Sequence, residues 1–425
     1  MRTCLKNMKY LYFNNINKNF EYYVGNCYVE NGNIVGFGLD DTNFDNVIDM
    51  TNKLVMPMFS NMNINLEEII YRKLSGNWDP EKVSSLENYF GNILSERDFE
   101  YYEHLAPASL REVINSGTGL ITTRRCWKTL SRAPIFSLAG YPITRNNLLK
   151  NYLNIEYINK ISSTFKAPNV LQGFFLKGLA SNDEGTLNFA KNNLSPSISF
   201  VAATIAQTEL SKNIVFQKWQ QKELEILENF GLLNRKTLLF GCNFLTTEEL
   251  YKIKEHNATI VFTPVATKTL SVVPGNPIEA ENLNIDWCLA SGALSLSDSA
   301  NMIYHMQETK KMFNTLSETA IIKAVCITPI SVLKKITGID ISGQANFSVI
   351  DTNANFNDVN ECIKWLFTVD PKTLRIQLMM NGNFISYGET DNLEEAKNYL
   401  RSFHKKFDTY LENPNMFVNE IPQKP

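Results

Sequence analysis

Long apolar runs, paired cysteines and an excess of either charge are all missing from this sequence. No stretch approaches the roughly eighteen consecutive apolar residues of a membrane-spanning helix, and the N-terminal segment contains no apolar run of signal-peptide length. The seven cysteines stand singly, without a CxxC pair, which excludes a zinc knuckle or dithiol motif and favours a reducing compartment. The formal net charge is only -3, so no basic footprint for nucleic acid is visible. We therefore expect a cytoplasmic protein that binds neither membranes nor nucleic acids.

Histidine is scarce as well, because the chain contains only four: His104, His256, His305 and His404. The first three lie in segments with a helical pattern, and the fourth lies in a helical-looking segment near the C-terminus. None stands at the end of a predicted strand, so the four cannot assemble a cluster of imidazoles in one site. We expect all of them to be ordinary surface or helix-cap residues.

The residues that are present indicate a globular chain with a large core. Hydrophobic residues make up 44% and charged residues 20% of 425 positions, enough for a barrel and an accessory domain. From about residue 57 to 345, short β-branched runs alternate with longer amphipathic segments, a pattern typical of β/α units. The predicted strands are 54–59, 119–123, 135–139, 170–176, 198–202, 237–240, 259–263 and 285–290. Eight such units predict an α/β fold with a (β/α)8 TIM-type barrel.

Both ends of the chain carry further strands, with turn signals at Asn31-Gly32 and Asn381-Gly382. We expect residues 1–56 and 346–390 to join into one composite β-sandwich domain, and residues 57–345 to form the barrel. Residues 391–425 are expected to form a C-terminal helix, at 392–410, and a tail. Within the barrel we expect helices at 210–230, at 300–311 and at 247–256, the last opened by the capping sequence that starts at Thr246.

A series of fragments, in order and without large gaps, resembles the motifs of the amidohydrolase superfamily, specifically its chlorohydrolase and nucleobase-deaminase branch. The resemblance runs from about Glu30 to Gly388 and implies a barrel flanked by a small β-domain. The fragments are ENGNIVGFG at 30–38, LVMPMFSNMNINL at 54–66, GTGLITT at 117–123, TIAQT at 204–208, GCNFLTTEEL at 241–250, PVAT at 264–267, ASGA at 290–293 with Met302 beyond it, GQANFSVID at 343–351 and NGNFISYG at 381–388.

The resemblance also places the family's metal ligands, which are four histidines and an aspartate at the ends of strands one, five, six and eight. Those positions correspond here to Asn63, Asn65, Thr204, Gly241 and Gly292. Catalytic metal sites need imidazole or carboxylate donors, and neutral amides hold a cation poorly. The glutamate that shuttles the proton corresponds to Gln207, whose amide is neither a general acid nor a general base at neutral pH. We therefore expect no metal and no cofactor.

Eight residues near the predicted strand ends are candidates for ligand binding, and none is assigned a catalytic role. Asn63, Asn65, Thr204 and Gln207 would form a neutral floor that either binds a polar small molecule or fills the old site. Cys242 lacks a histidine in its motif to activate it as a nucleophile. The candidates are Asn63, Asn65, Arg124, Thr204, Gln207, Cys242, Ser291 and Asp298.

Two of these candidates have alternative roles that the sequence leaves open. Arg124, next to Arg125, could clamp a carboxylate or phosphate, or could be an ion-pair partner. Asp298 could replace the missing aspartate, or could cap the helix expected at 300–311.

The loss of every expected ligand predicts a catalytically silent amidohydrolase-like protein, and thus no enzyme. Such a pseudoenzyme would bind a small polar ligand or a protein partner, and the resemblance implies a homodimer. The alternative is a metal-independent hydrolase that acts on carbon–nitrogen (non-peptide) bonds in a remodelled barrel pocket. In that case Arg124, Cys242 or Asp298 would matter for the reaction.

Overall fold

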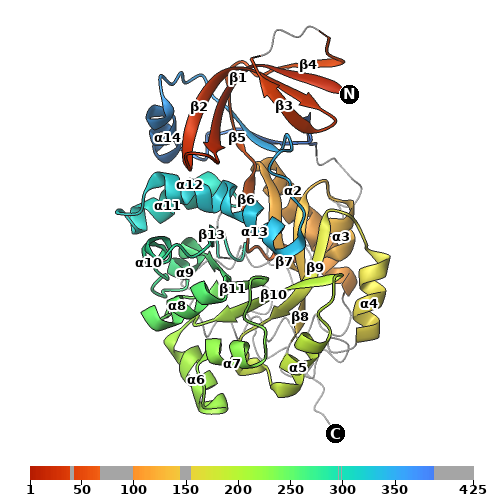
Figure 1. Ribbon diagram of the computed structural model, residues 1–425, viewed down its shortest axis with the longest axis vertical. Coiled ribbons are helices and arrows are strands. Elements are labelled where there is room, and N and C mark those ends of the chain that lie inside the picture. The colour runs from red at the N-terminus through yellow and green to blue at the C-terminus, as the bar shows by residue number, and fades with distance from the viewer. Residues whose placement is uncertain (39–42, 68–98, 144–154, 295, 298, 387–425) are drawn as a thin grey trace, which may run out of the picture.

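Parallel strands buried on both faces form the centre of the molecule in the computed structural model (Figure 1). The structure describes residues 1–38, 43–67, 99–143, 155–294, 296–297 and 299–386. Strand β7 is buried at every position, and β8 at every position but its first, as expected for parallel strands covered on both sides. The barrel strands are β6 (Phe59–Asn61), β7 (Thr118–Arg124), β8 (Phe136–Ile143), β9 (Val170–Leu176), β10 (Ile198–Ile205), β11 (Thr237–Gly241), β12 (Thr259–Phe262) and β13 (Trp287–Leu289).

These eight strands pair in chain order, each parallel to the next, and form a nearly closed barrel. The predicted α/β class with a TIM-type barrel is therefore confirmed. Helices follow the strands and form the outer layer (Figure 1). They are α2 (Phe99–Asn115), α3 (Trp127–Arg132), α4 (Ile155–Thr164), η2 (Leu179–Ser181), α5 (Glu184–Asn192), α6 (Glu209–Trp219), α7 (Glu223–Asn229), α8 (Thr247–Glu255), α9 (Pro264–Thr269), α10 (Pro277–Asn282), α11 (Met302–Met312), α12 (Glu318–Cys326) and α13 (Thr328–Thr337).

The two ends of the chain build one curled sheet beside the barrel, at the top of Figure 1. Its strands run in the order β16-β15-β14-β5-β1-β2-β3, with β4 paired to β1, so both ends contribute as predicted. Helix α14 (Val359–Thr368) packs against β2. The strands are β1 (Arg2–Asn14), β2 (Asn19–Glu30), β3 (Asn33–Phe37), β4 (Asn46–Asp49), β5 (Lys53–Pro57), β14 (Phe347–Asp351), β15 (Ile376–Met380) and β16 (Asn383–Phe384).

The strand predicted at 54–59 is in fact two strands in two different sheets. β5 pairs with β14 in the end sheet, whereas β6 pairs with β7 in the barrel. At the crossing, Met58 N donates to Asn346 O and Phe59 N donates to the Ser348 hydroxyl. The sequence does not show this change from one sheet to the other, because both strands are buried and together read as one apolar run.

The helix predicted at 210–230 is also divided, into α6 and α7. Gln220 takes the left-handed conformation with φ 54° and ends α6. The helix expected at 300–311 begins instead after Asn301, whose side chain accepts a hydrogen bond from Ile303 N at 3.0 Å. The predicted helix at 392–410 lies outside the described residues.

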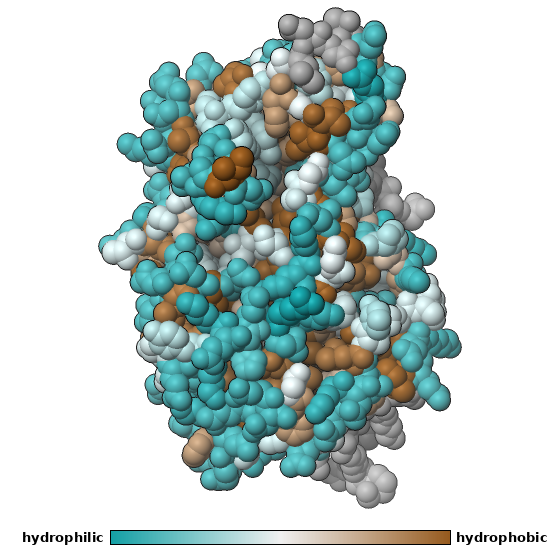
Figure 2. All heavy atoms as spheres, viewed as in Figure 1, coloured by the Kyte–Doolittle hydropathy of each residue, from teal (hydrophilic) through white to brown (hydrophobic). Residues whose placement is uncertain are grey.

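The outer surface is mostly hydrophilic on the face drawn in Figure 2, with hydrophobic residues gathered over part of the end sheet. Exposed apolar side chains of that sheet include Val24, Val35, Phe37 and Val47. None of the helices that the structure describes is both long and apolar enough to cross a membrane.

Candidate functional site

A cavity of about 500 Å³ opens where the barrel strands end. Its lining comes from the loop after β6, the last residue of β7, and the ends of β9, β10, β11, β12 and β13. In a TIM barrel this C-terminal face is where active sites are built. The residues that line it include Asn63, Asn65, Arg124, Phe175, Lys177, Thr204, Gln207, Thr208, Leu210, Ile214, Phe240 and Asn243.

Five of the eight candidate residues meet in this cavity: Asn63, Asn65, Arg124, Thr204 and Gln207. They arrive from three separate parts of the chain, because the parallel strands bring their C-terminal ends to one face. Cys242 and Ser291 are buried and are not part of the lining. Asp298 lies outside the described residues.

Ser291 is held in the seam where the first and last barrel strands meet. The Asn61 amide donates to the Ser291 hydroxyl at 2.7 Å, and Ser291 N donates to Asn61 Oδ1 at 3.1 Å. Next to this pair, Gly292 N donates to Asn63 O at 3.0 Å. Asn61 and Ser291 are both fully buried, so their side chains join β6 to the segment after β13.

Cys242 sits behind the pocket and is not prepared for nucleophilic attack. Its side chain is 2% exposed, and its Sγ lies 3.8 Å from Phe240 O. Burial, reinforced by the nearby Glu223 and Glu249 carboxyls, raises the pKa of the Cys242 thiol well above its ordinary value. Since the thiolate is the nucleophile, this environment keeps the sulfur unreactive.

Arg124 lines the cavity and also has a buried ion-pair partner. Its Nε donates to Glu67 Oε1 at 3.1 Å, and Arg125 Nη1 lies 3.9 Å from the same oxygen. The Glu67 side chain is 3% exposed. The ion-pair role is thus present, and it fixes the direction of a guanidinium that reaches the cavity wall. Glu67 was not predicted, because it follows the strand-one motif without a recognisable pattern of its own.

Two aromatic side chains of the lining were not anticipated either. Phe175 on β9 and Phe240 on β11 stack with ring centroids 5.4 Å apart and an interplanar angle of 18°. Their only sequence signal is an aromatic residue close to the end of a buried strand. Together they make part of the cavity lining apolar.

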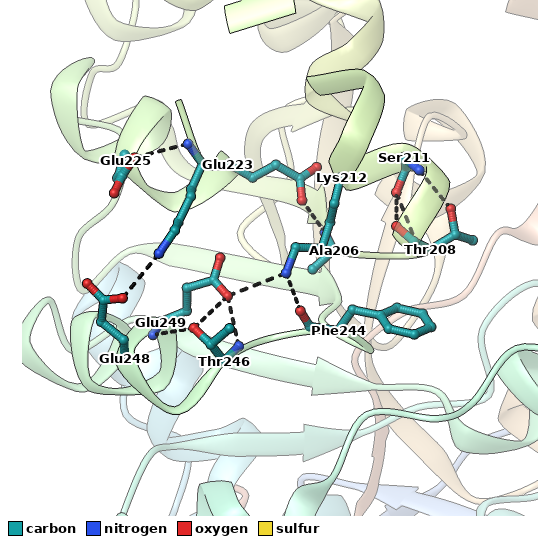
Figure 3. Close-up of polar contacts among 11 residues, drawn as sticks. Ala206, Thr208, Ser211, Lys212, Glu223, Glu225, Phe244, Thr246, Glu248 and Glu249 are labelled. Atoms are coloured by element: carbon teal, nitrogen blue, oxygen red, sulfur yellow. Dashed lines mark hydrogen bonds and ion pairs between the residues drawn. The ribbon is translucent and has the colours of Figure 1, made fainter. Parts of the chain in front are cut away.

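A second set of polar residues, outside the cavity lining, holds the loops after β10 and β11 by hydrogen bonds (Figure 3). Glu223 Oε2 accepts a hydrogen bond from Ala206 N at 2.6 Å, directly before the lining residue Gln207. Lys212 donates to Phe244 O and lies 3.6 Å from Glu249 Oε2. Burial raises the pKa of Glu223 to about 7, although the hydrogen bond from Ala206 opposes this shift.

The residues at the family's five ligand positions do not fit a zinc ion. Asn63, Asn65 and Thr204 line the cavity, but they offer neutral oxygens where zinc prefers imidazole, thiolate or carboxylate. Among the residues that the structure describes, no group of three or more His, Cys, Asp or Glu side chains could hold a metal ion.

The remaining two ligand positions are glycines that cannot be replaced easily on this backbone. Gly241 has φ +80°, and a Cβ there would lie 2.6 Å from Ile205 O. Gly292 has φ +74°, and its Cβ would lie 2.8 Å from the Ala266 Cβ. A metal-binding side chain at either position would require the backbone to move.

Comparison with known proteins gives no match to any family model. Two curated sequences are similar to parts of the chain, and both are named 5-methylthioadenosine/S-adenosylhomocysteine deaminase. The protein from Clostridium tetani is 25% identical over 103 residues, which are 24% of each chain. The one from Pyrococcus abyssi is 23% identical over 257 residues, which are 57% of this chain and 59% of that protein. This chain therefore matches less than two thirds of the length of either relative.

Solved structures resemble the chain over nearly its whole length. An adenosine deaminase from Xanthomonas campestris with bound zinc superposes with a TM-score of 0.80 at 13% identity, covering 96% of this chain and 99% of that one. The atrazine chlorohydrolase from Arthrobacter aurescens TC1, complexed with zinc, gives 0.78 at 10% identity, with 94% and 99% covered. A guanine deaminase from C. acetobutylicum with bound guanine gives 0.77 at 14% identity, with 91% and 100% covered.

These comparisons correct one expectation. The sequence led us to expect a protein that is not an enzyme, whereas the proteins it resembles in sequence and in fold are named deaminases and hydrolases. The chain has the fold of these two deaminases and of the atrazine chlorohydrolase.

Proposed function

We propose that this protein is a hydrolase that acts on a carbon–nitrogen (non-peptide) bond of a small polar ring compound, without a metal held by histidines. In the deaminase form of this reaction, water adds to a ring carbon that bears an amino group, and ammonia leaves. The observation that carries the proposal is the cavity at the barrel's C-terminal face, which is lined by amide, hydroxyl and guanidinium groups together with a stacked aromatic pair.

The lining suits a flat molecule with hydrogen-bonding edges. Asn63, Asn65 and Gln207 can each donate and accept hydrogen bonds. The stacked pair Phe175 and Phe240 supplies the apolar surface that a ring needs. The names of the relatives support the same class, because they are deaminases of 5-methylthioadenosine and S-adenosylhomocysteine, adenosine and guanine.

The chemical contribution of this lining is stabilisation of charge rather than activation of water by a metal. Addition of water to a ring carbon pushes negative charge onto the ring nitrogens. Fixed N–H donors aimed at that charge, from Asn65 and from Arg124, favour the transition state over the bound substrate. Arg124 is held for this by Glu67, so its donors need no reorientation during the reaction.

The test is turnover by the purified full chain with adenosine, 5-methylthioadenosine, S-adenosylhomocysteine and guanine, followed by product detection and ammonia release. We expect product from a ring compound of this class, in the presence of a metal chelator as well as in its absence. Gln207→Ala and Asn65→Ala should each lower kcat/KM about tenfold, the effect of losing one hydrogen bond in the transition state.

The matched control is Glu225→Gln, since Glu225 lies outside the lining and should leave kcat/KM unchanged. Calorimetric binding of a ring compound with no product from any of the four would contradict the hydrolase proposal. Equal activity in the wild type and in both pocket variants would place the reaction elsewhere.

A further inference from the structure

The backbone turns sharply at the point where β10 ends and the cavity begins. Ala206 is left-handed, with φ 44°, and the next two residues, Gln207 and Thr208, line the cavity. A residue with a Cβ pays a conformational cost in this region, so the surrounding structure must hold it there. The groups that hold Ala206 therefore help to decide where Gln207 lies.

Two loops are tied together at this turn. Ala206 O accepts hydrogen bonds from Asn243 N at 3.0 Å and from Phe244 N at 3.2 Å, and Cys242 N donates to Ile205 O at 2.8 Å. The Asn243 amide donates to Gln207 O at 3.0 Å. The loop after β10 and the loop after β11 thus form one hydrogen-bonded unit in the cavity wall.

Glu223 fastens this unit from behind. It is the first residue of α7, its side chain is buried, and its Oε2 accepts from Ala206 N at 2.6 Å (Figure 3). It is not part of the cavity lining, so it does not contact a ligand in the cavity. An acceptor at this place satisfies the N–H that the left-handed turn directs away from the strand ladder.

We propose that Glu223 is a positioning residue, which holds the Ala206–Gln207 turn and so links the shape of the cavity to proton binding. The importance of the cavity rests on the proposed function, but the link between Glu223 and the turn does not. Deprotonation leaves a negative charge in a buried site, and opening of the loop lets water reach that charge. Opening should therefore become easier as Glu223 loses its proton.

The charged and titratable groups that act on Glu223 come from three neighbouring elements. Lys212 on α6 favours the charged form, whereas Glu249 on α8 opposes it. The Cys242 thiol after β11 is close enough to sense the carboxyl. On α7 itself, Glu225 accepts a hydrogen bond from Lys222 N, and the Lys222 side chain pairs with Glu248 at 3.1 Å. Burial outweighs the favourable contacts and raises the pKa of Glu223 to about 7, so the change falls near neutral pH.

The experiment is hydrogen–deuterium exchange of the full chain without any ligand, from about pH 5 to about pH 8, corrected for intrinsic exchange rates. In the wild type, opening of the segment 204–211 should increase with pH by up to about tenfold per pH unit below the carboxyl's pKa, the limit for release of one proton. Glu223→Gln keeps an acceptor without a titrating proton and should make opening independent of pH. Glu223→Ala should raise opening at about pH 5, where the wild-type carboxyl is protonated, because Ala206 N–H loses its acceptor.

Glu225→Gln is the matched control on the same helix and should behave as the wild type. The proposal is overturned if Glu223→Gln keeps the pH dependence, if Glu223→Ala leaves exchange at 204–211 unchanged at about pH 5, or if Glu225→Gln has the same effect as Glu223→Gln. Since no substrate is involved, a failure here leaves the hydrolase proposal standing. If the turnover assay detects no product, the hydrogen–deuterium exchange experiment still tests the role of Glu223.

Discussion

His305 shows how far a single residue can depart from what its sequence context predicts. We expected a surface or helix-cap histidine, which is what His256 is at the end of α8. His305 is instead fully buried on α11, with its Nε2 2.9 Å from Ser299 O. Burial lowers the pKa of His305 to about 4. The helical pattern around it could not reveal this, because the burying surface comes from distant parts of the chain.

Because of this low pKa, the free energy of unfolding should fall as the pH falls. The unfolded chain binds a proton at His305 near pH 6.5, whereas the folded chain does so only near pH 4. The stabilisation of the folded chain by neutral His305 is complete above pH 6.5. It is lost as the pH falls from 6.5 toward 4. The wild type should lose up to about 3 kcal/mol in the free energy of unfolding from this group.

Urea unfolding across that pH range provides the check. His305→Gln should reduce the loss of unfolding free energy between pH 6.5 and pH 4. His256→Gln, at a partly exposed position, should lose as much as the wild type. An identical acid dependence in wild type and His305→Gln would contradict the assignment.

Asn61 and Asn63, two residues apart in one motif, should respond differently to truncation. Asn61→Ala leaves buried polar groups of Ser291 without their partner, at a cost of about 1 to 3 kcal/mol. Asn63→Ala should change stability by less than about 0.5 kcal/mol, because its side chain faces the cavity. Equal unfolding free energies for both variants, from urea titration, would show that the seam does not depend on Asn61.

At the scale of elements, the sequence predicted correctly those features that depend on neighbouring residues, such as the start of a helix. The capping sequence at Thr246 is confirmed: its hydroxyl accepts from Glu249 N, and Glu249 Oε2 accepts from Thr246 N at 2.8 Å. The division of the predicted strand at 54–59 was missed, because the choice between two sheets depends on β14, which follows nearly three hundred residues later.

The break between α6 and α7 leads to a prediction about the residue that makes it. Gln220 is left-handed, a conformation that glycine adopts without steric cost. Gln220→Gly should raise the free energy of unfolding by about 0.5 kcal/mol, after allowing for glycine's extra freedom in the unfolded chain.

Gln217→Gly, inside α6, is the matched control and should lower the free energy of unfolding by about 1 kcal/mol. Thermal or urea unfolding measures both. A loss of stability in Gln220→Gly would mean that its hydrogen bond to Gln217 O outweighs the strain.

At the scale of the molecule, the order of the strands and the face that carries the cavity could be predicted from the sequence. Asn65 and Gln207 were placed there because each follows a recognisable strand end, and the cavity joins them. Glu67 and Glu223 could not be found this way. Their importance comes from contacts between neighbouring elements, with Arg124 and with Ala206, that no local spacing encodes.

Other whole-molecule expectations stay predictions. They are the homodimer, the protein partner, and the division into residues 1–56 with 346–390, residues 57–345 and residues 391–425. Their tests are the oligomeric state of the purified chain and limited proteolysis at the three boundaries.

The central claim is that the proposed hydrolysis in the cavity needs no metal held by histidines, although two of the similar solved structures contain zinc. The most direct measurement is the zinc content of the purified full chain by inductively coupled plasma mass spectrometry, after incubation with zinc and dialysis. We predict far less than one zinc per chain, since the described lining offers zinc no imidazole or carboxylate. One zinc per chain that survives dialysis would contradict the account.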